Sequence, residues 1–227
     1  MNYFEFLDMG READGRKVLR VNILREKSCT FNCVICPLKK AHFGEATTFG
    51  EIQDSLAVLE QKLEQEKPDL VDLRGNGEPM TNDQIVKVID FVHSKGLPVR
   101  LYTNGYLLGI MPHMRIASMC EEVLGCLSFT EEESFRRIHR PLSGYSCRAH
   151  LDHMAKFSHQ YKGKFILKIT ILKGYNDSEE QIQNLKNEIE KIHPTVVDVV
   201  TINYGKAEKI MAVAKERLAE IKEILEN

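Results

Sequence analysis

Three cysteines lie within eight residues of one another near the start of the chain, at Cys29, Cys33 and Cys36. Cysteine thiolates are soft ligands that suit zinc ions and iron–sulfur clusters. A structural zinc site needs four protein ligands, and His42 could complete a set of three cysteines and one histidine. A cubic iron–sulfur cluster held by three cysteines leaves one iron for a ligand that is not protein, which is a catalytic arrangement. The spacing alone is compatible with both kinds of centre.

The other three cysteines, Cys120, Cys126 and Cys147, come from separate segments and lack paired ligand spacing. We expect them to be small buried residues. The amino terminus has no apolar signal core, which predicts a cytoplasmic protein. Its thiols are then expected to stay reduced instead of forming disulfides.

The composition is that of an ordinary soluble protein: of the 227 residues, 43% are hydrophobic and 28% are charged. No stretch approaches the roughly 20 apolar residues that a membrane-spanning helix needs, so a membrane protein is not expected. The formal net charge of -2 gives no general attraction to phosphate backbones, which argues against a module that binds nucleic acid by itself. No linker rich in Pro, Gly or Ser divides the chain, so we expect one domain over 1–227.

Six apolar runs of strand length alternate with segments of helical period, which indicates repeated strand–helix units. The expected strands are 18–24, 69–75, 98–105, 123–130, 165–172 and 198–204. The expected helices cover 49–66, 83–95, 112–121, 146–161, 178–192 and 206–226. Such units predict parallel strands joined by right-handed crossovers.

Alternation within the strands predicts one apolar and one polar face of the sheet. In the fifth strand Phe165, Leu167 and Ile169 share one face, and Lys168 and Thr170 share the other. Similar splits place Arg20, Asn22, Asp72, Arg74, Cys126, Ser128, Thr201 and Asn203 on the polar face, with Val200 and Ile202 opposite. The alternative for any single polar residue is pairing with another near a strand end.

A parallel sheet between two helix layers should be apolar on both faces, so one polar face favours a curled sheet with a wet or ligand-filled interior. We therefore predict an α/β fold, an incomplete (β/α)6 barrel of the TIM type, over a flat doubly wound sheet. An amino-terminal segment 1–17 precedes the barrel at 18–204. A last helix at 206–226 is expected to pack on the barrel through Met211, Ala214, Leu218, Ile221 and Leu225.

The pattern C-x3-C-x2-C after the first strand resembles the cluster loop of the radical SAM superfamily. Three further segments match in order at strand ends: "GNGEP" at 75–79, "TNG" at 103–105 and "LKGYNDSEE" at 172–180. With "RRIHRP", the set is most similar to the wybutosine-related Fe–S oxidoreductases. The sequence departs from the usual pattern at Ile35, where an aromatic residue is common, and at Asn76, where a glycine is common.

This resemblance implies a [4Fe–4S] cluster on Cys29, Cys33 and Cys36, with S-adenosylmethionine (SAM) chelating the fourth iron. One electron from the reduced cluster would cleave SAM to methionine and a 5′-deoxyadenosyl radical, which abstracts hydrogen from a substrate. The protein must position the cofactors and exclude water and oxygen. An oxygen-sensitive oxidoreductase that works under anaerobic conditions is therefore expected.

The resemblance also implies contacts to SAM. The segment Asn76, Gly77, Glu78 and Pro79 would meet the methionine ammonium. Thr103, Asn104 and Ser128 would hydrogen-bond the ribose or the methionine carboxylate, and Leu172 would pack on adenine. Without the cysteine loop, the same residues would be read as a tight turn and as ordinary caps of strand ends.

Two cationic residues are candidates for catalysis. Lys168 is predicted to point into the barrel, where an ammonium without a partner is costly, so it is expected to contact substrate or cofactor. Arg140 belongs to a basic cluster with Arg136, Arg137 and His139. It could meet the SAM carboxylate or an anionic substrate, or be a solvated loop charge.

Six strands cannot close a barrel of the eight-strand size, so we expect a lateral opening covered by a macromolecular substrate or a partner protein. RNA, a peptide or a protein glycyl site would fit. A ferredoxin or flavodoxin is the expected electron donor. Two alternatives stay open, an activase that installs a glycyl radical on a partner and a non-enzymatic zinc-binding interaction module.

Overall fold

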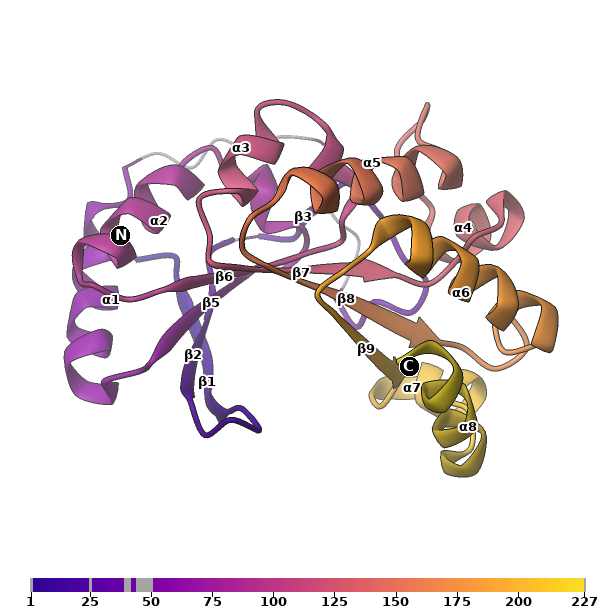
Figure 1. The fold of residues 1–227 in the computed structure, drawn as a ribbon. Helices are drawn as coiled ribbons and strands as arrows, with labels where there is room; N and C mark the ends of the chain where they lie inside the picture. Colours follow the sequence, from indigo (N-terminus) through magenta and orange to yellow (C-terminus); the bar gives the residue numbers. More distant parts are fainter. Residues whose placement is uncertain (1, 25, 39–41, 44–50, 227) are drawn as a thin grey trace.

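The computed structural model describes residues 2–24, 26–38, 42–43 and 51–226. A seven-stranded sheet runs in the order β1-β2-β5-β6-β7-β8-β9, and a two-stranded sheet pairs β3 with β4. In the large sheet only β1 and β2 are antiparallel, and every other neighbouring pair is parallel. Figure 1 shows α1, α2, α3, α5 and α6 on one side of the curled sheet, with the β1–β2 hairpin and α7–α8 near its two edges.

The strands of the large sheet are β1 (Glu5–Arg11), β2 (Lys17–Asn22), β5 (Leu70–Arg74), β6 (Val99–Thr103), β7 (Glu122–Leu127), β8 (Lys164–Ile171) and β9 (Val196–Thr201). The short strands are β3 (Ser28–Cys29) and β4 (His42–Phe43). The helices are α1 (Gln53–Glu66), α2 (Ile85–Ser94), α3 (His113–Ala117), α4 (Glu132–His139), α5 (Cys147–Gln160), α6 (Glu179–Ile192), α7 (Gly205–Met211) and α8 (Lys215–Leu225), with 3-10 turns η1 (Pro79–Thr81) and η2 (Tyr106–Gly109).

The six predicted strands are confirmed as the parallel strands β2 and β5 to β9, and the partial barrel is confirmed. Its core lies between the sheet and the helices on its outer face. Val71, Leu73, Leu101, Val123 and Leu167 are all fully buried there. The sheet has two edge strands, β1 and β9, that are not paired with each other, so the barrel stays open. No helix in the described ranges is both long and apolar enough to cross a membrane.

Besides the short strands β3 and β4 and the two 3-10 turns, one longer strand and one helix were not predicted. The first is β1, whose residues are mostly exposed or half-buried and whose register against β2 shifts between Phe6 and Asp8. Such an irregular, acidic strand carries almost no period-2 signal. The second is α4, which is only eight residues long and buries Phe135, Ile138 and His139.

The carboxyl-terminal helix predicted at 206–226 is wrong in extent, because the chain forms two helices, α7 and α8. The backbone between them bonds to the sheet instead of continuing the helix. Lys173 N donates to Met211 O (2.7 Å), and Val213 N donates to Thr201 Oγ1 (3.1 Å). Val213 is buried at this break.

The predicted faces of the last strand were also wrong. Lys168 is paired with Asp198 and Thr170 with Val200, so Asp198 and Val200 lie on the interior side. Thr201 lies on the opposite side and accepts from Val213 N. The run Val196–Thr201 is almost continuously apolar, and alternation cannot be read from such a run.

Candidate functional site

The three cysteines follow β2, at the carboxyl edge of the sheet. Cys29 is buried in β3, and Cys33 and Cys36 are half-buried in the loop that follows. Phe31 N donates to Cys29 Sγ (3.4 Å), and Cys36 N donates to Cys33 O (3.2 Å). Burial raises the pKa of Cys29 to about 11, and it raises the pKa of Cys33 further, with added repulsion from the Cys29 and Cys36 thiolates.

This donor set fits a cationic centre. Thiolates that lie close enough to repel one another, with one of them buried, gain from a bound metal, which lowers thiol pKa values and neutralises the charge. Within the described ranges, no three His, Cys, Asp or Glu side chains converge closely enough to hold a single metal ion. A cubic cluster places each sulfur on a different iron, so it does not require that convergence. The side chain of His42, the predicted fourth zinc ligand, lies outside the described residues.

A glycine turn places the cysteine loop against the end of β5. Ser28 N donates to Asn76 O (3.2 Å), and Glu78 N donates to Ser28 O (2.8 Å). Gly77 has φ 134° between these bonds, and a Cβ there would lie 1.8 Å from Ser28 O. Only glycine permits this approach. Asn76 N is held in turn by Asn22 Oδ1 (2.8 Å) at the end of β2.

The carboxylate of Glu78 joins the ends of β5 and β6. Glu78 is fully buried. Its Oε1 accepts from Thr103 Oγ1 (2.8 Å) and Met80 N (3.2 Å), and its Oε2 accepts from Asn104 N (2.7 Å). Burial raises the pKa of Glu78 to about 7, although these three hydrogen bonds favour the charged form. The predicted contact with a ligand ammonium stays a prediction, and in the structure the side chain organises the rim.

Asn104 carries this connection to the cysteine loop. Its Nδ2 lies 2.9 Å from Thr30 Oγ1 and 3.7 Å from Cys29 Sγ, and it donates to both. Its carbonyl oxygen lies 2.9 Å from Nε2 of the buried His150. Cys29 therefore has two N–H donors, one from the loop backbone and one from the end of β6.

The carboxyl end of α4 contacts the same loop from the other side. Asn32 N donates to His139 O (2.9 Å), and Val34 N donates to Ile138 O (2.9 Å). The ring of His139 is buried, and its Nδ1 lies 3.2 Å from Cys33 Sγ. Burial lowers the pKa of His139 to about 3, with a smaller contribution from His150, so this imidazole is neutral at physiological pH.

The predicted basic cluster around Arg140 does not form one surface. His139 is buried and neutral, Arg136 pairs with Glu132 (2.5 Å), and Arg137 lies over the ring of Tyr175 (5.4 Å). Arg140 follows α4 with φ 45°, and its side chain is exposed. These side chains point to different neighbours, so the sequence cluster is not a common anion site.

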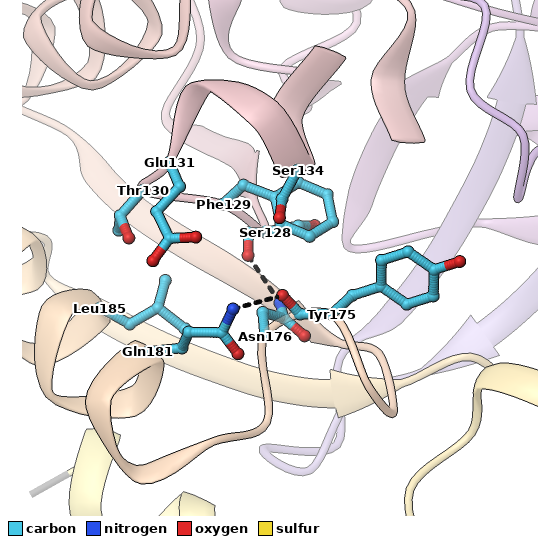
Figure 2. A pocket seen from close by; sticks show the side chains of 9 residues that line it. All are labelled: Ser128, Phe129, Thr130, Glu131, Ser134, Tyr175, Asn176, Gln181 and Leu185. Carbon is cyan, nitrogen blue, oxygen red and sulfur yellow. Dashed lines mark hydrogen bonds between the residues drawn. The ribbon is translucent and has the colours of Figure 1, made fainter. Parts of the chain in front are cut away.

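Ser128 and Leu172 lie further along the rim, at the ends of β7 and β8. Figure 2 shows the small pocket there, which is lined by Ser128, Phe129, Thr130, Glu131, Ser134, Tyr175, Asn176, Gln181 and Leu185. Asn176 Nδ2 donates to Ser128 O (2.6 Å), and Asn176 Oδ1 accepts from Leu172 N (2.6 Å). The cavity volume of about 10 Å³ has room for one water. The predicted ribose and adenine contacts of these residues stay predictions.

The interior face of the sheet carries Lys168, as alternation predicted. Its Nζ lies 3.7 Å from Asp198 Oδ2 and 5.7 Å from the centre of the Tyr102 ring. The guanidinium of Arg74 lies over the same ring at 4.6 Å. Cys126 hydrogen-bonds to Tyr102 and is half-buried, so it is a thiol of the barrel interior. The prediction that it is a buried core residue was therefore wrong. The prediction that Cys120 and Cys147 are buried is confirmed.

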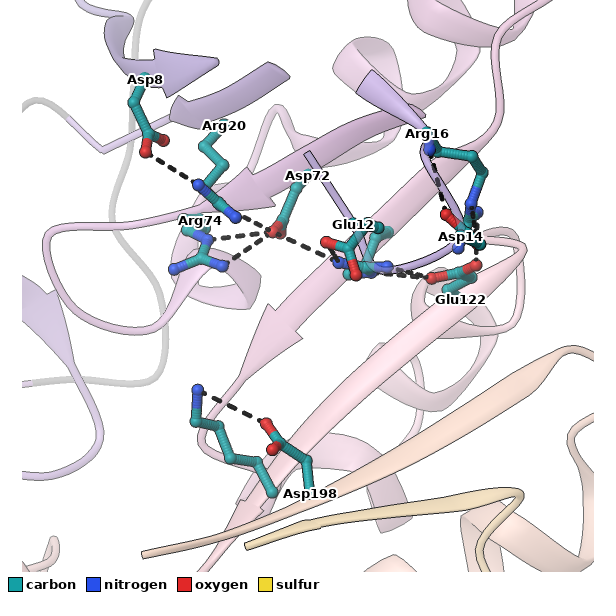
Figure 3. Close-up of polar contacts among 11 residues, drawn as sticks. Asp8, Glu12, Asp14, Arg16, Arg20, Asp72, Arg74, Glu122 and Asp198 are labelled. Carbon is teal, nitrogen blue, oxygen red and sulfur yellow. Dashed lines mark hydrogen bonds and ion pairs between the residues drawn. The ribbon is translucent and has the colours of Figure 1, made fainter. Parts of the chain in front are cut away.

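An ion network joins the β1–β2 hairpin to β5, β6 and β7 on the interior side of the sheet (Figure 3). Arg100 is buried and bonds Glu122 Oε2 through Nε (2.8 Å) and Glu12 Oε1 through Nη1 (2.9 Å). Arg16 also reaches Glu122 (2.8 Å), while Asp72 accepts from Arg74 (2.8 Å). Glu12 and Arg16 belong to the β1–β2 hairpin, which these contacts hold against β6 and β7. We call this set the floor network.

Two residues organise the site in roles that the sequence analysis did not give them. Asn22 bonds three segments, since it accepts from Leu24 N (3.0 Å) and Asn76 N and donates to Glu5 Oε2 (3.1 Å). Its burial on the polar face was the available signal. His139 was assigned to a charged surface, and the apolar positions Phe135 and Ile138 on the same short helix were the missed signal.

Comparison with curated proteins finds distant relatives. The chain is 24% identical over 213 residues to the GTPase Obg of Brachyspira hyodysenteriae, covering 92% of this chain and 31% of that protein. It is also 24% identical over 203 residues to a UPF0026 protein of Helicobacter pylori, covering 85% and 64%. The chain thus spans about a third to two thirds of the length of these relatives. It contains no G-x4-G-K-[ST] phosphate loop. No family model matches it.

Solved structures share the fold at low sequence identity. A radical SAM methyltransferase from Sphaerobacter thermophilus aligns with TM-score 0.68 and 13% identity over 99% of this chain and 74% of its own. TYW1 with a lysine-pyruvate adduct bound aligns with TM-score 0.65 and 16% identity, over 92% of this chain and 72% of TYW1. Streptococcus suis SuiB bound to precursor peptide SuiA aligns with TM-score 0.64 and 16% identity, over 86% of this chain and 43% of SuiB. The curled parallel sheet, with the cysteine loop at its carboxyl edge, therefore has the radical SAM fold.

Proposed function

We propose that this protein is a radical SAM enzyme that holds a [4Fe–4S] cluster on Cys29, Cys33 and Cys36. The observation that carries the proposal is the position of this loop at the strand ends, together with the hydrogen bonds that its sulfur receives. Three thiols on one loop lie where β5 and β6 end, and Cys29 receives N–H donors from Phe31 and Asn104. N–H donors to the sulfurs are what a negatively charged cluster requires from its protein.

The chain's own residues position the reaction. When bound, the cluster supplies the electron that cleaves SAM to methionine and a 5′-deoxyadenosyl radical. The Gly77 turn brings the backbone of Asn76 beside the loop, where it would meet the methionine ammonium. Glu78 and Pro79 fix this turn, and Glu78 holds Thr103 and Asn104 in place.

Ser128, Asn104 and Leu172 are our proposed contacts for the nucleoside. Ser128 and Leu172 are tied to one another through Asn176 and so present one rigid wall of the rim. Arg140 is exposed next to the cysteine loop and is proposed to contact an anionic group of SAM or of the substrate.

The substrate is proposed to be macromolecular, an RNA or a peptide, and to enter through the open side between β1 and β9. Exposed apolar side chains lie on the cysteine loop and after β9: Val34, Leu38 and Tyr204 are each more than a third exposed. The pKa of Tyr204 is raised by burial and then by the charges of Cys36 and Cys33. An electron donor of the ferredoxin or flavodoxin type completes the proposal.

Anaerobic reconstitution tests the chemistry. With iron, sulfide, dithionite and SAM, the full chain should release 5′-deoxyadenosine, and Cys29→Ala, Cys33→Ala and Cys36→Ala should each reduce that release by at least about 100-fold. Cys120→Ala is the matched control, since that thiol is buried in the core, and it should retain the activity. A colourless chain that holds one zinc ion in air would contradict the proposal in favour of the zinc module.

Lys168 is proposed to contact substrate and not cofactor. Its weak ion pair with a half-exposed Asp198 leaves the ammonium available inside the barrel. Lys168→Met should leave SAM binding and slow uncoupled release of 5′-deoxyadenosine unchanged, and it should lower turnover of a cognate substrate by about tenfold or more. Lys173→Met, at an exposed position after β8, is the control. Loss of SAM binding in Lys168→Met would assign the residue to the cofactor.

A further inference from the structure

We propose that His139 is a positioning residue for the cluster: its Nδ1–H donates to the Cys33 sulfur and raises the reduction potential of the centre. This inference rests on the proposed function, because it assigns a role toward a cluster bound by Cys33. The geometric basis is the 3.2 Å separation between His139 Nδ1 and Cys33 Sγ. These residues are 106 positions apart in sequence, so the contact depends on the fold and not on the loop.

The backbone holds the two residues in register. Asn32 N donates to His139 O (2.9 Å) and Arg140 O (3.2 Å), and Val34 N donates to Ile138 O (2.9 Å). Leu142 N donates to Thr30 O (3.1 Å). The end of α4 and residues 30–34 thus run side by side like paired strands, with Cys33 between two bonded positions.

Aromatic rings fix the plane of the imidazole. Phe31 stacks on it with 5.1 Å between ring centres and an angle of 17°. Phe129 and Phe135 meet it edge-on at 5.2 Å and 5.4 Å. A ring held by three neighbours has no room to turn its Nδ1 away from the sulfur. Phe31, Phe129 and Phe135 belong to the same buried cluster as Cys29, and Cys33 packs against it.

The chemistry of the pair fixes the direction of the hydrogen bond once a cluster is bound. A ligating cysteine is a thiolate, which accepts hydrogen bonds and has no proton to donate. An imidazole nitrogen 3.2 Å from such an acceptor must carry the proton, so the form with the proton on Nδ1 is selected. Reduction adds one negative charge to the cluster, and an N–H aimed at a sulfur stabilises that extra charge. Cys29 already has such donors in Phe31 N and Asn104, and His139 supplies one for Cys33.

The experiment measures the midpoint potential of the reconstituted cluster by redox titration with electron paramagnetic resonance detection. His139→Phe keeps a flat ring among Phe31, Phe129 and Phe135 and removes the N–H. At a fixed potential near the midpoint, the ratio of reduced to oxidised cluster should fall by about tenfold, which is 59 mV for a one-electron couple. His139→Asn offers an amide N–H near the Nδ1 position and should restore most of the potential.

His153→Phe is the matched control. Its Nδ1 lies 2.7 Å from Tyr106 O, and its ring packs edge-on against Tyr106, so it belongs to the same aromatic region. Within the described ranges, neither of these contacts involves a cysteine. Its potential should equal that of the wild type. An unchanged midpoint potential in His139→Phe would overturn the inference. The proposed function would still stand in that case, because the variant would show the signal of a bound cluster.

A second readout uses the folded wild-type protein. With ¹⁵N-labelled histidine, the reduced cluster should show a weak hyperfine coupling to one nitrogen, too small for a direct ligand. The coupling should persist in His153→Phe and vanish in His139→Asn. Absence of any such coupling in the wild type overturns the role of His139, whereas absence of a reduced-cluster signal overturns the proposed function.

Discussion

At the scale of single residues, Asn104 and Glu78 determine how the rim is built. Asn104 donates from its backbone to Glu78 Oε2 and from its side chain to Thr30 and Cys29. Glu78 in turn holds Thr103 and the turn that begins at Met80. Each polar group in this series of hydrogen bonds has the next as its partner, and a buried polar network is most stable when every member has a partner. A single substitution here should therefore be felt at the cysteine loop.

The raised pKa of Glu78 predicts a pH-dependent stability. The pKa is about 7 in the folded chain against an ordinary value of 4.5. The stabilisation from the protonated form is complete below pH 4.5 and is lost as the pH rises through 7. That loss amounts to about 3 kcal/mol. Urea unfolding of the metal-free protein from pH 4.5 to 8 measures it, and Glu78→Gln should remove this component of the slope. A variant with the wild-type slope would show that Glu78 ionises normally.

At the scale of elements, the site is built where turns meet and not on any one strand. The cysteine loop touches the β5 turn at Gly77, the β6 end at Asn104 and the end of α4 at His139. None of these contacts is local in sequence. The loop therefore takes its shape from the sheet and from α4.

Gly77 should be far less tolerant of substitution than another glycine with positive φ. Gly77→Ala adds a methyl group 1.8 Å from Ser28 O, whereas Gly144→Ala at φ 83° meets nothing within 4 Å. Both pay the strain of positive φ, about 1–2 kcal/mol. We expect Gly77→Ala to lose at least about 2 kcal/mol more in urea unfolding and to load less iron. Equal losses for the two variants would mean that the turn can shift away from β3.

Sequence patterns predicted the sheet well and the connections poorly. In β2, β5 and β8 the polar residues Arg20, Asp72 and Lys168 each stand between buried apolar residues, and that part of the alternation survives folding. The cysteine spacing and strand-end motifs identified the rim for the same reason, because parallel strands end at one edge. His139 and Asn22 could not be assigned, since their roles depend on partners 106 and 54 positions away. The short helix α4 and the break between α7 and α8 depend on tertiary contacts that no local period records.

At the scale of the whole molecule, the floor network joins the β1–β2 edge of the sheet to its central strands. The β1–β2 hairpin reaches across through Glu12 and Arg16 to Arg100 on β6 and Glu122 on β7. Burial opposes ionisation of Glu122, but its hydrogen bonds to Arg16 and Arg100 lower its pKa below the ordinary value. The hairpin is thereby part of the sheet's structure, and we propose that residues 1–227 form one domain.

Arg100 should be the most sensitive member of this network. Arg100→Gln removes the buried cation that bonds Glu12 and Glu122, while Arg16 still pairs with Glu122 and Arg74 with Asp72. The cost should lie at the lower end of the about 3–5 kcal/mol for breaking a buried ion pair. Urea unfolding measures the loss, and raised salt should not reproduce it, because buried pairs are screened weakly. Arg148→Gln breaks an exposed pair with Asp152 and should cost less than about 1 kcal/mol. Similar losses in the two variants would show that the floor network adds little.

The distance along the chain between Cys33 and His139 sets an order of events during synthesis. A ribosome adds roughly 5–20 residues per second, so the thiols emerge on the order of ten seconds before the helix that clasps them. Until α4 has been made, the cysteine loop lacks the rings of Phe129 and Phe135 and the hydrogen-bond donor His139. Iron that arrived in this interval would find three sulfurs without their final arrangement. In the proposed enzyme, the cluster should therefore be loaded only into the completed chain, because His139 lies in its second half.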